Sequence, residues 1–538
     1  VYALFHLFLI LFCLVRFWQA KHWSEVSSRK IWWRVLTGGY VLLGLVNLVV
    51  LYKTATRGAI LGFGFGLIIS ALLIIWRGRE EGEKKFRRIA WVTLGLAVLV
   101  IGGFFAVKDS SWVAGSETLS RFASISATDR TTESRFMVWN MSWQGFKERP
   151  ILGWGPENYI LVFNKYYDPG MYNQEPWFDR SHNVIFDWLI NAGALGLLSY
   201  LSLFVISLYL LWWKKNNLSV TEKSLITGLL AAYFVHNIFV FDNLVSYLLF
   251  FALLGYVHFK STEETQNFVS PATALPKSQW PLAPVVITVA ILFLPTFYWL
   301  TAKPWLANRT LIQALSLQKY PQEELARFKK VFAYQTFAST EASEQLINVA
   351  LNVARNQSVP IEDRSALASL ARDQMAETIK REPENARYPF FLGSSLSRFG
   401  LYDEAKTYLN KALELAPRKQ AILFELGGLS VNQKKFDEAL NYFRQAYELD
   451  KSYSEAQKLY AVGAVYSKNL PLATTILEDG AKKDPSFLLD ERLVQAYGEI
   501  KQANALTALW QKAIVAHPEF EKAVMDFIAD LKERGVIK

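Results

Sequence analysis

The sequence is poor in cysteine and histidine. Its single cysteine, Cys13, lies inside an apolar run, which excludes an internal disulfide and any metal centre built from several cysteines. There are six histidines in 538 residues, and no carboxylate–histidine cluster occurs at the spacing of metal ligands. We therefore predict that the chain has no metal site and needs no cofactor.

Several motifs of catalysis and binding are also absent. The sequence has no glycine-rich phosphate loop, no His-Glu-x-x-His and no Gly-x-Ser-x-Gly. A nucleotide-driven pump and a zinc protease are therefore disfavoured. The net charge of +10 is not accompanied by any nucleic-acid-binding motif. Many of its cations stand in short loops beside apolar segments, where they indicate membrane topology, so we predict no nucleic-acid partner.

What the chain has in abundance is apolar sequence. At 52% hydrophobic and 15% aromatic residues it is too apolar for an ordinary soluble protein, which predicts several membrane spans joined to a soluble part. Most of the apolar runs approach the roughly 20 residues that cross a bilayer. They lie at about 1–15, 35–52, 59–76, 89–107, 188–213, 225–240, 244–259 and 281–300.

The first run has no basic start and no cleavage site, so it is not a signal peptide. We expect instead that Val1 opens a truncated chain whose earlier spans are missing. One consistent path of the chain through the membrane satisfies the positive-inside rule. It places three basic segments in the cytoplasm, the loops 16–34 and 77–88 and the pair Lys214-Lys215. That path places Arg57 and the loop 108–182 on the outer side.

The stretch 225–259 leaves the later topology open. Phe241-Asp242-Asn243 marks a turn, which favours a hairpin of two short spans. The linker 261–279, with Pro271, Pro276 and Lys277, is then cytoplasmic, and the run 281–300 carries the tail outward. If 225–259 is one span, everything after it lies in the cytoplasm.

After Pro304 the composition becomes that of a soluble helical domain, and a period of 34 residues is visible. Copies begin at Ala386, Gln420 and Ser454, and a looser copy follows from Leu488. Small residues at fixed offsets let paired helices approach, and neighbouring copies share one core. The pattern resembles the tetratricopeptide repeat. Such an array usually offers a concave surface to a protein partner, although a spacer or a stabilising lid remains the alternative.

The polar loop 108–182 is long for a connection between spans, and long loops are usually functional. Arg57 stands at the outer mouth of a span beside Gly58, which allows close packing and favours an inward-pointing arginine over one that snorkels to the interface. Arg135 and Trp139 recur at helical spacing in an amphipathic helix. The alternative for Arg135 is a surface arginine paired with Glu133.

His182 ends the loop. A neutral imidazole there can accept a proton from a hydroxyl near pH 7, although a lone histidine is more often a hydrogen-bonded structural residue. We interpret His236, within a span, as a helix-packing residue. Two arginines and a histidine at an outer membrane face suit an anionic, lipid-borne substrate, because arginine holds phosphate oxygens in pairs and keeps its charge. Fixed cations also stabilise a departing pyrophosphate without a metal.

In order and context, these residues resemble the O-antigen ligase family, which also contains O-antigen polymerases and bacterial protein O-oligosaccharyltransferases. The match covers about residues 35–260. The segments that carry it are Thr56-Arg57-Gly58-Ala59, Glu133-Ser134-Arg135 with Trp139, 149–158 (RPILGWGPEN), Ser181-His182-Asn183 and 193–197 (GALGL).

The resemblance implies an all-α fold, a polytopic helical membrane bundle of the C-type glycosyltransferase kind followed by a tetratricopeptide-repeat solenoid. It implies metal-independent transfer of a glycan from an undecaprenyl-pyrophosphate carrier to an acceptor hydroxyl, at the outer face of the bacterial inner membrane. About half of the family's usual spans are absent before Val1.

Carried over by position, Arg57 and Arg135 would hold the pyrophosphate, and His182 would orient or deprotonate the acceptor. Gly153 and Gly155 would shape the loop. Further substrate-binding residues are expected at Arg180, Asn183 and Trp139.

The expected division is into transmembrane helices (1–107), an extracytoplasmic catalytic loop (108–182), further transmembrane helices (183–303), a helical linker or cap (304–385) and repeats (386–538). The acceptor stays open between lipid A core, another glycan repeat and a protein. A glycan polymerase with the same site is a second enzyme hypothesis. A non-catalytic membrane scaffold that recruits envelope proteins through its repeats is the alternative from another class.

Overall fold

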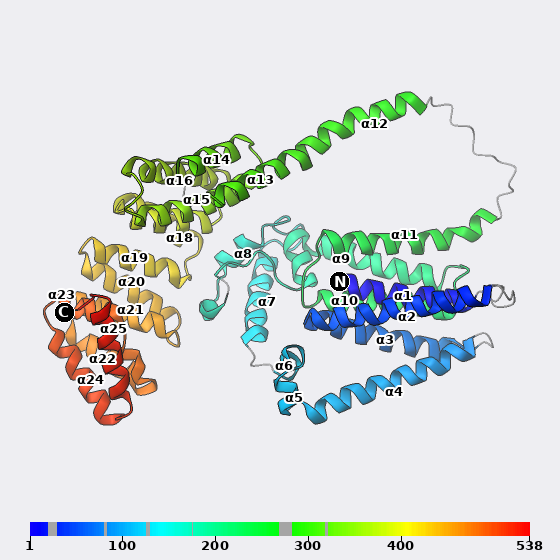
Figure 1. Ribbon diagram of the computed structural model, residues 1–538, viewed down its shortest axis with the longest axis horizontal. Coiled ribbons are helices and arrows are strands. Elements are labelled where there is room, and N and C mark those ends of the chain that lie inside the picture. Colours follow the sequence, from blue (N-terminus) through cyan, green and yellow to red (C-terminus); the bar gives the residue numbers. More distant parts are fainter. Residues whose placement is uncertain are drawn as a thin grey trace. The chain divides into compact units, whose positions relative to one another are not determined.

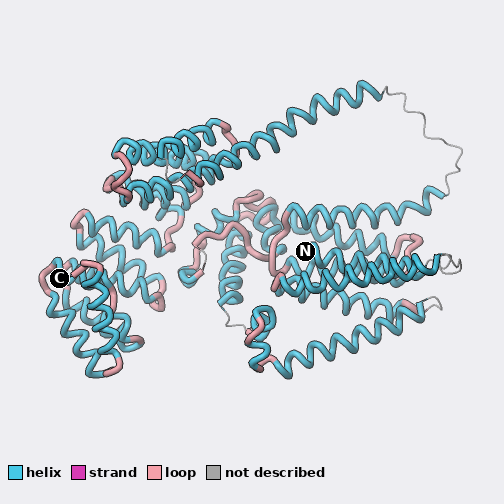
Figure 2. The backbone as a smooth tube through the Cα atoms, in the orientation of Figure 1, coloured by secondary structure: helices cyan, strands magenta, loops and turns pink. Residues whose placement is uncertain are grey.

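The computed structural model describes residues 1–19, 29–79, 83–124, 130–174, 176–267, 282–317 and 321–537. Within these ranges the chain is made of helices and loops, with no strand (Figure 2). The predicted all-α fold is therefore confirmed. Lys21 of the first basic loop and Pro271, Pro276 and Lys277 of the predicted linker lie outside the described residues.

The chain forms two compact units. The first combines residues 1–159 with 178–277, and the second combines 160–177 with 278–538. A short piece of the polar loop thus belongs to the unit that contains the repeats. The finer five-part division expected from the sequence stays a prediction.

The first unit is a bundle of long apolar helices (Figure 1). Its long helices are α1 (Tyr2–Gln19), α2 (Arg29–Lys53), α3 (Arg57–Arg77), α4 (Lys84–Val107), α9 (Val184–Trp212), α10 (Val220–Asn237) and α11 (Leu244–Asn267). The polar loop adds α5 (Ser111–Ala114), α6 (Glu117–Ala123), α7 (Arg130–Glu148) and the start of α8 (Tyr159–Lys165).

Seven helical segments of the described chain are long and apolar enough to cross a membrane. Six of them lie in α1, α2, α3, α4, α9 and α11, and the seventh is Val286–Leu315. The run 225–259 forms two helices, α10 and α11, separated by a turn at residues 238–243. Among the described residues α11 contains a candidate span and α10 does not, so the predicted hairpin of two short spans stays a prediction. Large apolar side chains on α2 and α4 are exposed, among them Leu42 and Val98, as expected of helices that face lipid.

Helices α3 and α10 form the closest pair of the bundle. A Cβ atom on Gly62 would lie 2.5 Å from the carbonyl oxygen of Ala232, so the two backbones approach to a distance that only glycine permits. His236 is buried at this contact, in keeping with its interpretation as a packing residue.

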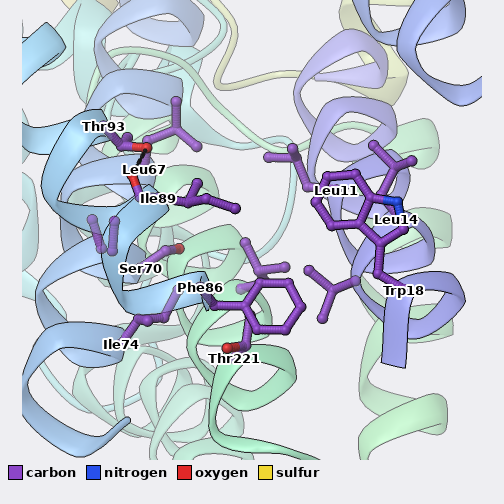
Figure 3. Close-up of a pocket in the computed structure, with 14 residues that line it drawn as sticks. Leu11, Leu14, Trp18, Leu67, Ser70, Ile74, Phe86, Ile89, Thr93 and Thr221 are labelled. Atoms are coloured by element: carbon purple, nitrogen blue, oxygen red, sulfur yellow. Dashed lines mark hydrogen bonds between the residues drawn. The ribbon is translucent and has the colours of Figure 1, made fainter. Parts of the chain in front are cut away.

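An apolar cavity of about 200 Å³ opens between α1, α3, α4 and α10. Trp18 and Leu14 of α1 face Phe86 and Ile89 of α4 across it (Figure 3).

The second unit begins with a long helical stretch and continues as a solenoid of helix pairs, coloured from green to red in Figure 1. Its first part comprises α12 (Leu282–Phe297), η4 (Tyr298–Ala302), α13 (Lys303–Leu315), α14 (Pro321–Ala333), α15 (Ala338–Arg355) and α16 (Ile361–Arg381). The repeats comprise α17 (Arg387–Arg398), α18 (Tyr402–Leu415), α19 (Gln420–Asn432), α20 (Phe436–Leu449), α21 (Ser454–Tyr466), α22 (Leu470–Lys483), η5 (Pro485–Leu488), α23 (Glu491–Glu499), α24 (Ala503–Ala516) and α25 (Phe520–Glu533).

The helix pairs recur with the predicted period of one repeat. Ala405 and Leu409 of α18 are fully buried, and so is Ala439 at the matching position of α20. The small residues bring the paired helices together and the larger ones fill the space between neighbouring pairs. The buried apolar residues form successive clusters along the tail, at 311–429, 439–459 and 461–524.

Candidate active site

The turn between α10 and α11, residues 238–243, is where the predicted site segments meet. A Cβ atom on Gly58 would lie 3.2 Å from Cβ of Phe239, so the start of α3 packs against this turn. The guanidinium of Arg135, on α7, lies 5.9 Å from the centre of the Phe239 ring. Phe239 therefore brings together the two segments that carry Arg57 and Arg135.

Two residues further along, Phe241 contacts the end of the polar loop. The rings of His182 and Phe241 meet edge to face with centroids 5.3 Å apart. The guanidinium of Arg180 lies 5.5 Å from the centre of the same ring. Because Phe239 and Phe241 are separated by only one residue, Arg57, Arg135 and His182 belong to segments that converge on one short turn.

Asp242 fixes this turn between three helices. Its carboxylate accepts hydrogen bonds from Tyr200 of α9 at 3.3 Å and from Asn237 of α10 at 2.8 Å. It also accepts one from Ser246 of α11 at 2.9 Å and one from Tyr233. A buried carboxylate with four donors is well compensated, so the backbone that carries Phe239 and Phe241 is held rigidly.

Arg57 is the first residue of α3 and is half-buried. Its Nη2 lies 3.4 Å from the hydroxyl of Ser124, at the end of α6. The hydroxyl of Thr118, also on α6, donates to the carbonyl of Tyr52 at 3.2 Å. The first part of the polar loop is thus folded back onto the ends of α2 and α3, next to Arg57.

Arg135 and Trp139 lie on α7, which is helical as predicted. The indole of Trp139 stacks on Phe186 of α9 with centroids 5.9 Å apart. On the same helix, Ser142 is hydrogen-bonded to the hydroxyl of Tyr159 at 3.3 Å. Burial raises the pKa of Tyr159, which keeps this hydroxyl neutral. These contacts hold α7 against the first turn of α9, close to His182 in the chain.

His182 has a left-handed backbone, with φ of 53°. Its neighbours on both sides hold it there. Ser181 donates to Asp187 Oδ1 from its amide at 2.9 Å and from its hydroxyl at 2.7 Å. The side chain of Asn183 accepts from the amide of Ile185 at 2.9 Å and begins α9 as its N-cap. A non-glycine residue in this conformation costs about 1–3 kcal/mol of strain. The surrounding structure must therefore be rigid enough to hold His182 in it.

Asn183 was expected to bind substrate. In the structure its amide oxygen caps α9, so its described role is to set the direction of the helix after His182.

Gly153 and Gly193 allow the polar loop to rest directly on α9. Gly153 has φ of 69°, and a Cβ on it would lie 2.4 Å from the carbonyl oxygen of Ile190. Gly193 has φ of 64°, and a Cβ on it would lie 2.2 Å from the carbonyl oxygen of Ile151. The amide of Trp154 donates to Ile190 at 2.6 Å across this contact. Gly155, with φ of 94°, completes the turn.

Arg180 forms an ion pair with Glu157. Its side chain is 21% exposed and that of Glu157 is 70% exposed, so the pair lies at the rim of the site. The opposite charge of Glu157 weakens the attraction of Arg180 for an anion. Arg149 stacks over Trp154, with its guanidinium carbon 4.1 Å from the ring centre.

No sequence pattern predicted that Phe239, Phe241, Asp187 or Glu157 would lie at the site. Phe241 and Asp242 were noted only as a turn between apolar runs. A signal was present for Asp187, because an acidic residue one turn into an apolar helix needs a polar partner. Nothing in the sequence indicated which aromatic residues would face Arg135 and His182.

Within the described ranges, no group of three or more His, Cys, Asp or Glu side chains is placed to hold a metal ion. Metal-independent chemistry nevertheless stays a prediction.

Comparison with known proteins matches both parts of the chain. Residues 39–201 match the model of the O-antigen ligase family. Residues 386–419 and 421–453 match the tetratricopeptide repeat. A TPR repeat-containing protein of Pseudomonas aeruginosa is 36% identical over 99 residues, which are 18% of this chain and 17% of that protein.

Solved structures give weaker likenesses. MamA of Desulfovibrio magneticus is 16% identical, covers 34% of this chain and 96% of its own, and has a TM-score of 0.25. The structure described as a functional characterisation of Pseudomonas aeruginosa pilF is 16% identical, covers 42% of this chain and all of its own, and has a TM-score of 0.27. Because both TM-scores are this low, we infer nothing about function from either structure.

The segments that converge on the turn 238–243 include Arg57, Arg135 and His182, and all three positions fall inside the O-antigen ligase match. The resemblance expected from the sequence is thereby confirmed: the chain has several membrane-length helices, its residues 39–201 match the O-antigen ligase family model, and its tail matches the tetratricopeptide repeat.

Proposed function

We propose that this protein is a membrane glycosyltransferase that moves a glycan from an undecaprenyl-pyrophosphate carrier to an acceptor hydroxyl. The observation that carries the proposal is the convergence on residues 238–243. Phe239 contacts Arg135 and the start of α3, and Phe241 contacts His182. Two permanent cations and one titratable imidazole near one rigid turn suit a reaction that expels a diphosphate and removes a proton.

In the proposed reaction the acceptor oxygen attacks the anomeric carbon of the donor sugar. A carbon–oxygen bond forms, and the bond from that carbon to the pyrophosphate oxygen breaks. The electron pair leaves with the pyrophosphate, whose growing charge Arg57 and Arg135 stabilise. The acceptor's proton goes to His182, which releases it to water after transfer. No metal is needed, because guanidinium groups already supply fixed positive charge.

The other predicted residues take supporting roles in this proposal. Arg180 is paired with Glu157, so it contributes less to binding the diphosphate than Arg57 and Arg135 do. Its contact with Phe241 instead helps to fix the loop segment that leads to His182. Trp139, stacked on Phe186, supports the face of α7 from which Arg135 extends.

The proposal places the site on the outer face of a bacterial inner membrane, because the lipid-linked donor is used there and the basic loops favour that orientation. The acceptor class is left to experiment. Lipid A core, a growing glycan and a protein hydroxyl each present the same attacking oxygen.

The test follows donor consumption, so that it does not depend on the acceptor. Membranes that contain the full chain are given undecaprenyl-pyrophosphate carrying a radiolabelled glycan, and loss of label from the lipid fraction is measured. We expect Arg57→Lys and Arg135→Lys to slow consumption by about tenfold or more, because lysine cannot form the paired contacts. His182→Gln is expected to slow it by about a hundredfold, the typical contribution of a general base.

Matched controls separate chemistry from folding. Arg121→Lys changes an exposed arginine of α6, and His258→Gln changes an exposed histidine of α11. Both are expected to retain full activity. If the three site variants also retain full activity at normal protein levels, the enzymatic proposal is wrong and a scaffold is favoured. The labelled product then assigns the acceptor: lipid A core, a ladder of longer glycans, or protein.

A further inference from the structure

A short piece of the polar loop is embedded in the repeat unit. Residues 160–177 belong to the same compact unit as the repeats, although the chain on both sides of them belongs to the other unit. The piece contains the end of α8 and η3 (Pro169–Asn173). Phe163 and Met171 within it are almost fully buried. A polar loop does not bury such side chains by itself, so the repeats supply the covering surface.

Lys419, which precedes α19, is the centre of this contact. Only 2% of it is exposed, and its ammonium donates to the carbonyl of Pro176. Three aromatic rings of the loop piece surround it. The ring centres lie 3.9 Å away at Trp177, 4.5 Å at Tyr167 and 5.2 Å at Phe163. Such a cage replaces much of the solvation that a buried ammonium loses.

Further contacts spread along the repeats. Gln420 donates from its side chain to the carbonyl of Pro169 at 3.2 Å. Tyr172 stacks on Tyr453 with ring centres 3.9 Å apart and planes within 12° of parallel. Trp177 lies 5.8 Å from Phe390 of α17 and packs against the core of the first repeats.

Two of the repeat residues in this contact occupy matching positions. Lys419 and Tyr453 are one repeat period apart in the sequence, and both directly precede the first helix of a repeat. They and Phe390 come from three successive repeats, α17, α19 and α21. A surface built from the same position of successive repeats is the kind that such arrays offer to a bound peptide.

We propose that the repeats bind the loop piece, residues 160–174 and 176–177 of their own chain, so that the tail is a positioning domain for the polar loop. Arg180 and His182 follow Trp177 by three and five residues, so binding of the loop piece to the repeats limits the movement of the segment that carries them. The aromatic cage also occupies this part of the repeat surface, which makes it unavailable to a separate partner. The contact itself can be tested whether or not the transferase proposal is correct.

The proposed contact also determines on which side of the membrane the tail lies relative to the polar loop. A contact between the polar loop and the tail requires both to lie on the same side of the membrane. Among the described residues between His182 and the repeats, three segments qualify as spans by length and composition, in α9, α11 and α12–α13. Three crossings would separate loop and tail, so α10 must cross as a fourth. Glu222 and Lys223 near its start make α10 less apolar than the other long helices. Glu222 forms an ion pair with Arg16, with a nitrogen–oxygen distance of 3.2 Å.

The contact is tested by cross-linking the full chain in membranes. In a Cys13→Ser background, Tyr172→Cys is combined with Tyr453→Cys, and a site-specific protease site is inserted at about residue 273. After treatment with a short bis-maleimide and the protease, linked fragments run together on a denaturing gel. The control pair combines Tyr172→Cys with Lys434→Cys, which lies beyond the far end of α19, roughly 20 Å away.

We expect at least fivefold more linked product from the first pair than from the control. Adding Lys419→Glu should reduce the linked product at least fivefold, because a carboxylate is repelled by the carbonyl and by the ring faces. Arg418→Glu, an exposed neighbour, should leave it unchanged. Equal yields from the two cysteine pairs in a chain that stays monodisperse in detergent would overturn the proposal.

A second measurement does not depend on cross-linking geometry. Lys165→Cys and Lys434→Cys, each alone in the Cys13→Ser background, are exposed to a membrane-impermeant maleimide in intact spheroplasts. Both positions are exposed in the structure. We expect the two to be labelled alike, either both before or both only after permeabilisation. Labelling of one but not the other means that loop and tail lie on opposite sides, and the proposed contact is then impossible.

Discussion

The ring of His182 lies edge to face against the ring of Phe241, with centroids 5.3 Å apart and planes at 62°. The two residues come from different segments, the polar loop and the α10–α11 turn. Because His182 also has a left-handed backbone, its ring direction is set by this contact as well as by its own chain. Phe241 is therefore a positioning residue for the proposed base.

We predict that Phe241→Leu slows donor consumption by about tenfold to a hundredfold, since a misplacement of about 1 Å has an effect of that size. The rate of turnover should fall more than donor binding, because the arginines are unchanged. Phe251→Leu, an exposed position on α11, is the control and should have no effect. Normal turnover in Phe241→Leu would show that the ring direction of His182 is set elsewhere.

A second prediction concerns Asp187, which accepts both bonds from Ser181 through a single oxygen, Oδ1. Asparagine retains that oxygen and leucine does not. We expect Asp187→Asn to keep most of its activity and stability, and Asp187→Leu to lose about 1–3 kcal/mol of stability together with activity. Thermal unfolding in detergent and donor consumption measure the two effects. If asparagine is as damaging as leucine, the carboxylate charge itself is required.

The third prediction concerns the close approach of the loop to α9. Gly193→Ala places a Cβ 2.2 Å from a carbonyl oxygen and imposes a strained φ, so we expect a loss of about 1–3 kcal/mol of stability. Gly255→Ala, at a helical glycine with nothing within 4 Å, should be neutral or stabilising by about 0.5–1 kcal/mol. Equal thermal unfolding of the two variants would mean that the loop can move off α9.

Much of this architecture follows from patterns that are local in the sequence. Apolar length predicted the long helices, and the repeat period predicted the paired helices of the tail, because both depend on residues a few turns apart. Arg57 and His182 could be predicted because each is a polar group near the edge of an apolar run, and Arg135 because it recurs with Trp139 at helical spacing.

The contacts among these residues could not be predicted in the same way. Phe239 and Phe241 are two of 37 phenylalanines, and only the folded chain shows that they face Arg135 and His182. Arg180 is predicted to bind substrate, but its ion pair with Glu157, 23 residues earlier, could not be predicted from the sequence. Lys419 carried no signal at all, since its aromatic cage comes from a segment more than two hundred residues earlier.

The last prediction concerns pH. Burial lowers the pKa of Lys419 to about 7 from an ordinary value of 10.5. Once the loop piece is released, the lysine returns to its ordinary pKa. Between about pH 7 and 10.5 the released state therefore binds more protons than the docked state, so docking becomes stronger as pH rises through this window.

Tyr167 faces Lys419, and burial raises its pKa further above the ordinary value of 10, so it stays neutral for most of that window. The measurement is thermal unfolding of the full chain in detergent at about pH 7 and about pH 9, wild type against Lys419→Met. We expect the wild type to gain stability relative to the methionine variant at the higher pH, by up to about 1.4 kcal/mol per pH unit, because methionine has no proton to lose. A difference that does not change with pH would mean that the aromatic cage keeps Lys419 charged, and the docking contact would then be held by a cation throughout.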